Sequence, residues 1–254
     1  MSPDQVLAEA AAWVWVPPEA RTVDTAEFLL VAHPAHFSDP TVATRWDSDR
    51  PADELIDEVL GAAHGLGRDA VTFFELSEST RPPDLERRLR ERGAELTETL
   101  AVLALDLASG VPDLAVPDDV EVRRVLTVDD LRATELVDVA AFGGTPADDE
   151  ALARSAERLG DEPRYLALRD GAPLGTAGHA ISGETLRLWG GAVLPEARHT
   201  GVYRALLDAR LRAGVEAGCR LAMVKGRVET SAPVLLRSGF RQYGEVRAYR
   251  LARG

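Results

Sequence analysis

Residues 190–204 read Gly190-Gly191-Ala192-Val193-Leu194-Pro195-Glu196-Ala197-Arg198-His199-Thr200-Gly201-Val202-Tyr203-Arg204. An apolar strand ends at Pro195, a short loop follows, and Gly201 opens a long amphipathic helix. The first turn of such a helix exposes unpaired backbone N–H groups with partial positive charge, which favours a phosphate group. Gly201 lets the backbone come close to a ligand, and Arg198 adds a cation. The stretch therefore predicts an anion-binding loop between a strand and a helix.

Gly190 and Gly191 stand inside the strand that precedes this loop. Glycine in the interior of a strand weakens the ladder and often marks a β-bulge. We therefore expect a bulge at this pair that frees backbone groups from the sheet.

Hydrophobic periodicity and turn residues divide much of the remaining chain into helices and strands. The segment 111–119 contains Pro112 and Pro117 and has no amphipathic period, which is typical of a linker. Before it the pattern predicts a helix over 51–65, a strand over 70–76, a helix over 84–92 and a strand over 99–107. After it we expect strand 120–126, helices 128–142 and 148–159, strands 165–169, 175–181 and 186–194, helix 201–217, strand 221–224, helix 231–237 and strand 245–251.

The same order of elements occurs twice, over 52–106 and again over 201–251. In both copies a helix and a glycine precede a strand, and a short helix and a second glycine precede the next strand. This order and spacing favour an internal repeat. Independent convergence of two similar α/β units is the alternative.

Composition excludes several classes of protein. The 254 residues are 45% hydrophobic and 28% charged, which indicates a globular chain and not a disordered one. The net charge of −13 argues against nucleic-acid or anionic-membrane partners, and all of the excess acid lies in residues 1–115. One cysteine, Cys219, excludes an internal disulfide and a cysteine-based zinc site. Without a membrane-spanning run or a basic start, we expect a cytoplasmic protein.

The loop 198–203 resembles the Arg/Gln-x-x-Gly-x-Gly/Ala motif of the GCN5-related N-acetyltransferases, with Tyr203 in place of the last small residue. Residues 231–240, which end in Ser-Gly-Phe, resemble the second motif of that family. The order of elements over 120–251 also fits. The resemblance implies a mixed α/β fold of the α+β type, built from tandem domains that each have a mixed, mostly antiparallel sheet flanked by helices.

The resemblance also implies where acetyl-CoA binds. The amides of its pantetheine arm would pair with the strand edge near residues 192–194, and its pyrophosphate would lie on the N–H groups of residues 199–204. The expected cofactor-binding residues are Ala192, Val193, Leu194, Arg198, His199, Thr200, Gly201, Val202, Tyr203, Arg204 and Ser231.

On this view the domain organisation is a degenerate, incomplete copy of the fold over 1–110, a linker over 111–119 and the acetyltransferase domain over 120–254. At the loop of the first copy, Asp49 adds a negative charge and Pro51 lacks an N–H group. We therefore expect acetyl-CoA to bind only to the second copy.

Catalytic residues are harder to assign. Many family members carry a Tyr that protonates the departing thiolate, and the matching position here is Leu235. His179, on the middle strand of the meander, is a candidate base; an ordinary strand histidine is the alternative. Glu229, after strand 221–224, is a second candidate base; a solvated turn acid is the alternative. No set of side chains suggests a metal site: His33 and His36 lack a third ligand.

The sequence thus predicts an N-acetyltransferase that passes acetyl from acetyl-CoA to a primary amine of a small molecule or peptide. The amine would attack directly in a ternary complex, because no Ser/His or Cys/His arrangement suggests an acyl-enzyme. A non-catalytic acyl-CoA-binding or protein-interaction module is the alternative.

Overall fold

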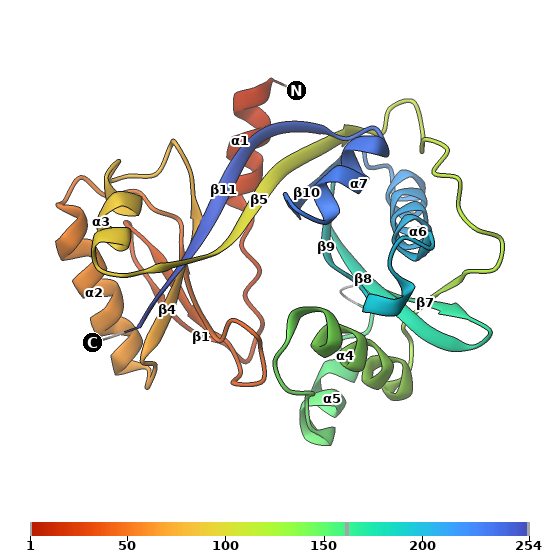
Figure 1. Cartoon of the computed structure of the whole chain (residues 1–254), viewed down its shortest axis with the longest axis horizontal. Coiled ribbons are helices and arrows are strands. Elements are labelled where there is room, and N and C mark those ends of the chain that lie inside the picture. The colour runs from red at the N-terminus through yellow and green to blue at the C-terminus, as the bar shows by residue number, and fades with distance from the viewer. Residues whose placement is uncertain (1, 161–162, 253–254) are drawn as a thin grey trace. The chain divides into compact units, whose positions relative to one another are not determined.

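The computed structural model describes residues 2–160 and 163–252. The chain forms two compact units, and each unit draws on more than one stretch of sequence. Unit 1 comprises residues 1–102, 226–232 and 243–254, and unit 2 comprises residues 103–225 and 233–242. Figure 1 labels most of their elements, and both units contain helices and strands, as a mixed α/β chain requires. The fold class predicted from the sequence is confirmed.

Unit 1 is a sheet whose strands follow the order β1-β2-β3-β4-β11-β5. The pairs β1–β2, β2–β3 and β4–β11 are antiparallel, and β3–β4 is parallel. Its elements are α1 (Pro3–Ala12), β1 (Arg21–Asp24), β2 (Leu29–Ala32), β3 (Thr41–Thr44), α2 (Ala52–Gly65), β4 (Ala70–Leu76), α3 (Leu85–Glu91), and parts of β5 (Glu95–Asp106) and β11 (Arg241–Ala252).

Unit 2 continues the strand order as β5-β10-β9-β8-β7-β6. The meander β6 to β9 is antiparallel, and β10 runs parallel to β9. Its elements are β6 (Glu121–Arg124), α4 (Val128–Phe142), α5 (Asp149–Ala156), β7 (Arg164–Arg169), β8 (Ala172–Ser182), β9 (Thr185–Val193), the 3-10 turn η1 (Pro195–Ala197), α6 (Val202–Glu216), most of β10 (Leu221–Arg227) and most of α7 (Ser231–Arg237).

The last strand of the chain completes the core of unit 1. Leu55, Ile56 and Val59 of α2 are fully buried against Phe73 of β4, at the spacing of one helix face. Tyr249 and Leu251 of β11 join the same core, and β11 pairs with β4 from Arg247↔Leu76 to Ala252↔Ala70. The compact units are therefore discontinuous in sequence. The functional division into 1–110 and 120–254 remains a prediction.

Glu86 of α3 holds β11 in place within unit 1. Its carboxylate accepts hydrogen bonds from Nε and Nη2 of Arg247, at 2.9 and 2.7 Å, and from the hydroxyl of Tyr249 at 3.0 Å. Burial by itself would raise the pKa of Glu86, but these hydrogen bonds outweigh it and hold the pKa below its ordinary value. The ionised carboxylate is thus the form that stabilises the unit.

Glu86→Gln is expected to lower the free energy of unfolding by about 1–3 kcal/mol at neutral pH, because it weakens a charge-assisted network. Since the folded pKa is depressed, this contribution is present above the ordinary pKa of 4.5 and is lost as the pH falls through the folded value. Urea denaturation at neutral and acidic pH measures both effects, with the exposed Glu78→Gln as the control. A loss of equal size at both pH values would contradict the assignment.

Candidate functional site

Strands β9 and β10 pair over only part of their length. Their parallel ladder runs from Leu221↔Thr185 to Val224↔Leu188. Beyond this point β9 continues to Val193 and pairs with β8 alone among the described residues. One edge of β9 between residues 189 and 193 therefore has backbone groups outside any ladder.

A bulge interrupts β9 at the start of this free edge. Gly178↔Trp189 and Thr176↔Ala192 are neighbouring pairs, so three steps along β9 match two steps along β8. Gly190 has φ of +59°, a conformation that glycine adopts without strain. The bulge predicted from the two glycines is confirmed.

Arg210 of α6 fixes the pair of residues that precedes the bulge. It is 1% exposed. Its Nη1 donates to the carbonyl oxygens of Gly178 at 3.2 Å and Trp189 at 3.5 Å, and its Nε donates to Leu206 O at 2.9 Å. A buried cation that bonds to two carbonyls on adjacent strands ties α6 to the distorted part of the sheet.

Tyr203 occupies the space that Gly191 leaves empty. A Cβ atom on Gly191 would lie 3.0 Å from Cε2 of Tyr203. Tyrosine at the position where the family motif has a small residue is therefore accommodated by a glycine on β9. Burial raises the pKa of Tyr203 and Arg210 opposes the rise, so the phenol is neutral at physiological pH.

The loop between η1 and α6 presents a row of free backbone donors. The residues His199 and Gly201 have φ of +64° and +90°, and the hydroxyl of Thr200 donates to Ala197 O at 2.7 Å. The first backbone bond of the helix is Ala205 N–H to Gly201 O. Within the part of the chain that the structure describes, the N–H groups of residues 199–204 donate to no acceptor. This geometry suits an anion.

The segment expected to be a linker packs behind this loop. Pro117 lies so close to Gly201 that a Cβ atom there would be 2.4 Å from its Cγ. Arg204 donates to Leu114 O at 3.1 Å, and Asp119 forms an ion pair with Arg169 at 2.8 Å. Gly201 is therefore required both by its positive φ and by the contact with Pro117.

Leu194, which was predicted with Ala192 and Val193 to bind the pantetheine arm, uses both of its backbone groups in hydrogen bonds within the chain. Its N–H donates to Leu174 O and its carbonyl accepts from Ala197 N–H, both at 2.9 Å. The free edge thus ends at Val193. Arg198, His199 and Thr200 are exposed in the loop.

The second motif forms the end of α7. Leu235, at the position of the missing tyrosine, is fully buried. Gly239 has φ of +93°, and Phe240 N–H donates to Leu235 O at 3.1 Å, so the Gly-Phe pair terminates the helix. Ser231 opens α7 and is grouped with unit 1.

The two candidate bases differ in environment. His179 is 2% exposed and stacks on Tyr165 with ring centroids 5.7 Å apart. Burial, with Arg210 and Arg124 nearby, lowers its pKa to about 4, so the imidazole is neutral and weakly basic. Glu229 is exposed in the turn after β10 and is grouped with unit 1. Both catalytic roles remain predictions.

A further group of charged residues escaped the sequence analysis. The Arg164 guanidinium forms ion pairs with Asp138 and, at 3.9 Å, with Glu135, and lies 5.6 Å from the ring centroid of Trp189. These four residues come from α4, β7 and β9, so periodicity alone could not join them. The one available signal was the i,i+3 spacing of the two acids on a predicted helix.

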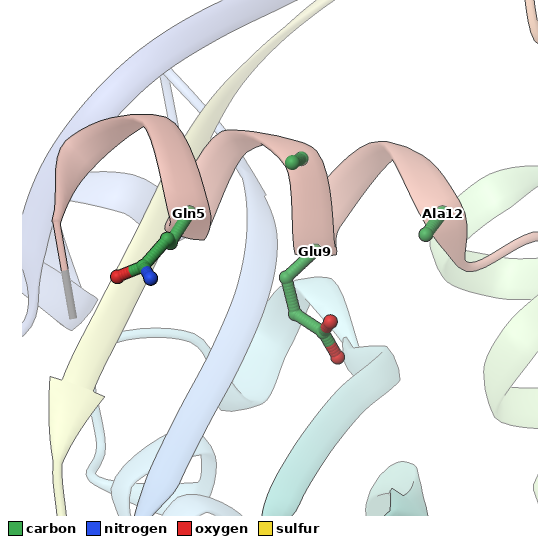
Figure 2. A pocket seen from close by; sticks show the side chains of 4 residues that line it. Gln5, Glu9 and Ala12 are labelled. Atoms are coloured by element: carbon green, nitrogen blue, oxygen red, sulfur yellow. The ribbon is translucent and has the colours of Figure 1, made fainter.

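Figure 2 shows a pocket lined by Gln5, Ala8, Glu9 and Ala12. All four residues lie on α1, so no second element brings further chemistry to it. Among the described residues, no group of three or more His, Cys, Asp or Glu side chains could hold a metal ion.

Gly191→Ala is expected to destabilise the fold by about 1–3 kcal/mol, because the new methyl group meets the Tyr203 ring. In a Tyr203→Ala background the same change should cost less, by at least about 0.5 kcal/mol. A double-mutant cycle in urea measures this coupling. Gly61→Ala, on open helix surface, is the control for loss of a glycine. Additive effects would show that the two residues do not interact.

Comparison with known proteins gives a consistent result. Residues 130–240 match the model of the acetyltransferase (GNAT) family. No curated protein sequence matches the chain. No helix within residues 2–160 and 163–252 is long and apolar enough to cross a membrane.

Solved structures share the fold at low identity. A GCN5-related N-acetyltransferase from Kribbella flavida has a TM-score of 0.68 at 17% identity, and the match covers 100% of this chain and 96% of that one. A conserved protein of unknown function from Staphylococcus epidermidis has a TM-score of 0.68 at 14% identity, covering 96% and 100%. A tandem GNAT protein from the clavulanic acid biosynthesis pathway has a TM-score of 0.58 at 17% identity, covering 94% and 85%. Residues 130–240 of this chain thus match the model of the GCN5-related N-acetyltransferase family, and the chain shares the fold of these solved structures.

Proposed function

We propose that the second half of the chain binds acetyl-CoA and transfers its acetyl group to a primary amine. One observation carries the proposal: the free edge of β9 leads directly into the row of free N–H groups at the start of α6. The edge at Ala192 and Val193 suits the amides of the pantetheine arm, and the N–H groups of residues 199–204 suit the pyrophosphate. Arg198 is exposed beside the loop and adds positive charge.

The transfer needs no covalent intermediate on the protein. The acceptor ammonium first loses a proton, the lone pair of the neutral amine nitrogen then attacks the thioester carbonyl carbon, and the carbon–sulfur bond breaks; the nitrogen gives up a second proton to become the amide, and the leaving thiolate takes up one proton to become the thiol. Cys219, the single cysteine, is 5% exposed, and burial together with Glu184 raises the pKa of its thiol, which makes it a poor nucleophile. The protein contributes chiefly by holding the thioester in position.

In the first half of the chain, a carboxylate of the protein itself lies at the loop before α2, where an anion would be expected. In the loop between β3 and α2, the Ser48 hydroxyl and Arg50 Nε donate to the carboxylate of Glu27, which precedes β2, at 2.5 and 3.0 Å. Arg50 also pairs with Glu58, and α2 begins after Pro51, which has no N–H to offer. These contacts support a first half that does not bind acetyl-CoA.

Two glycines at opposite ends of α6 offer a matched test of the loop. Gly201→Ala and Gly218→Ala both place a side chain at positive φ, +90° and +84°, but only Gly201 faces Pro117. We expect Gly201→Ala to weaken acetyl-CoA binding by about tenfold or more, because the free N–H groups move. Calorimetric titration measures the dissociation constant. Gly218→Ala shares the backbone strain at positive φ without the contact with Pro117, and it should keep its affinity; equal affinity in both variants would exclude the loop as the site.

Direct transfer makes a second prediction. Incubation with acetyl-CoA labelled in the acetyl group, without an acceptor, should leave no label on the denatured protein, since no residue forms an acyl-enzyme. Mass spectrometry of the intact chain reads this out. A stable increase of one acetyl mass on a single residue would contradict the mechanism.

The alternative is a non-catalytic acyl-CoA-binding or interaction module, which Leu235 at the tyrosine position favours. A screen of polyamines, aminoglycosides, amino acids and peptide N-termini for thiol release separates the two functions. Acetyl-CoA binding without transfer to any amine would support the module.

A further inference from the structure

Three buried polar atoms on one face of unit 2 have no hydrogen-bond partner among the described residues. They are Oδ1 of Asp138, Nε of Arg164 and Nε1 of Trp189. Most buried polar atoms in folded proteins are bonded to protein or to ordered water, so each exception calls for an explanation. Oδ1 of Asp138 is the acceptor among them, so it is the atom that a hydrogen-bond donor of a ligand could satisfy, and Arg164 contacts both of the other residues.

The geometry connects the three residues. Arg164 Nη2 pairs with Oδ2 of Asp138, which leaves Oδ1 free, and the guanidinium lies over the Trp189 ring. Glu135, one turn earlier on α4, stands 3.9 Å from Arg164 Nη1. One guanidinium thus serves two carboxylates, and the side chains of Asp138 and Glu135 are about four-fifths buried, at 20% and 22% exposure. Because two carboxylates share one guanidinium, the cluster has a surplus of negative charge when both are ionised, which favours a further cation.

The position of Trp189 relates this cluster to the proposed acetyl-CoA site. Trp189 directly precedes the Gly190-Gly191 bulge from which the free edge of β9 continues. Its indole lies on the same face as Gly178, whose added Cβ would be 2.3 Å from the ring. His179, the next residue along β8, lies on the opposite face, because successive side chains of a strand alternate between faces. The cluster therefore occupies the α4 face of the strand proposed to hold the thioester.

We propose that Asp138 binds the primary ammonium group of the acetyl acceptor through Oδ1, with the Trp189 indole against the acceptor's carbon skeleton. This inference rests on the proposed acetyltransferase function. It narrows the acceptor to amines that are protonated when they bind, and it places the amine beside the β9 edge.

The ionisation of Asp138 makes the site sensitive to pH. Burial raises its pKa to about 6, Arg164 opposes the rise, and Glu135 adds to it. Other charged or titratable groups on the neighbouring elements include Arg187, buried on β9, and His179, buried on β8 with its pKa lowered to about 4. On α5, Asp149 pairs with Arg132 and Glu150 pairs with Arg154. The carboxylate is charged above the folded pKa and neutral below it, whereas an alkylammonium stays charged throughout. Affinity for the amine should therefore fall as the pH drops through about 6.

The indole N–H signal of Trp189 gives a direct readout of binding. Four tryptophans give four indole signals in a proton–nitrogen correlation spectrum, and Trp189→Phe identifies the one needed. Benzylamine is the probe, and benzyl alcohol is its neutral counterpart. We expect benzylamine to shift the Trp189 signal at about pH 7.5, with affinity about tenfold lower in Asp138→Asn and also lower at about pH 5 in the wild type.

Asp129→Asn is the matched control, because Asp129 lies on the same helix with 94% of its side chain exposed and should leave binding unchanged. The pH series on the wild type tests the site even if Asp138→Asn does not fold. Equal binding of benzyl alcohol, an unshifted Trp189 signal, or unchanged affinity in a folded Asp138→Asn would each overturn the proposal.

The binding test is independent of turnover. If benzylamine binds as expected but no amine in the screen is acetylated, the proposed function fails while the amine site stands. If amines are acetylated with the same Michaelis constant in wild type and Asp138→Asn, the function stands and the site is excluded.

Discussion

Helix α6 packs so closely on strands β8 and β9 that only glycine fits beneath it at several points. A Cβ atom on Gly175 would lie 2.8 Å from Val202 of the helix, and one on Gly214 would lie 2.7 Å from Leu186 of β9. Protein interiors accept few rearrangements at such contacts. The close approach fixes the distance between the helix and the sheet. It also fixes where the first turn of the helix lies relative to the end of β9.

The chemistry of the candidate site follows from this packing. Because α6 sits low on the sheet, Arg210 reaches the carbonyl groups beside the bulge, and the Tyr203 ring lies over Gly191. The bulge and the early end of the β9–β10 ladder together leave an unpaired strand edge. The loop and the edge are therefore not two independent features, since both depend on where the helix meets the strand. Pro117 supports the same loop from behind.

Local patterns were sufficient to predict most elements after residue 50. The helices over 52–65, 128–142 and 202–216 agree with expectation to within one residue at each end. The first and third have an apolar face, and the second begins at the capping residue Thr127 and ends at Gly143. The first 50 residues gave no prediction, since β1, β2 and β3 have four residues each and show no usable alternation. Helix α1 did carry a signal, the capping box formed by Ser2 and Gln5.

The parts of the site that the sequence could not supply are those formed by distant segments. A strand over 245–251 was expected, but its pairing with β4 depends on a contact across more than half of the chain. The Asp138 cluster likewise joins α4, β7 and β9, and the carboxylate that accepts from Ser48 in the loop before α2 belongs to Glu27, outside the loop itself. The loops that precede α2 and α6 differ in how their hydrogen-bond donors are satisfied. In the loop before α2, a carboxylate of the chain accepts hydrogen bonds from the hydroxyl of Ser48 and the guanidinium of Arg50, whereas the N–H groups of residues 199–204 have no acceptor among the described residues and stay available to water or to an anion.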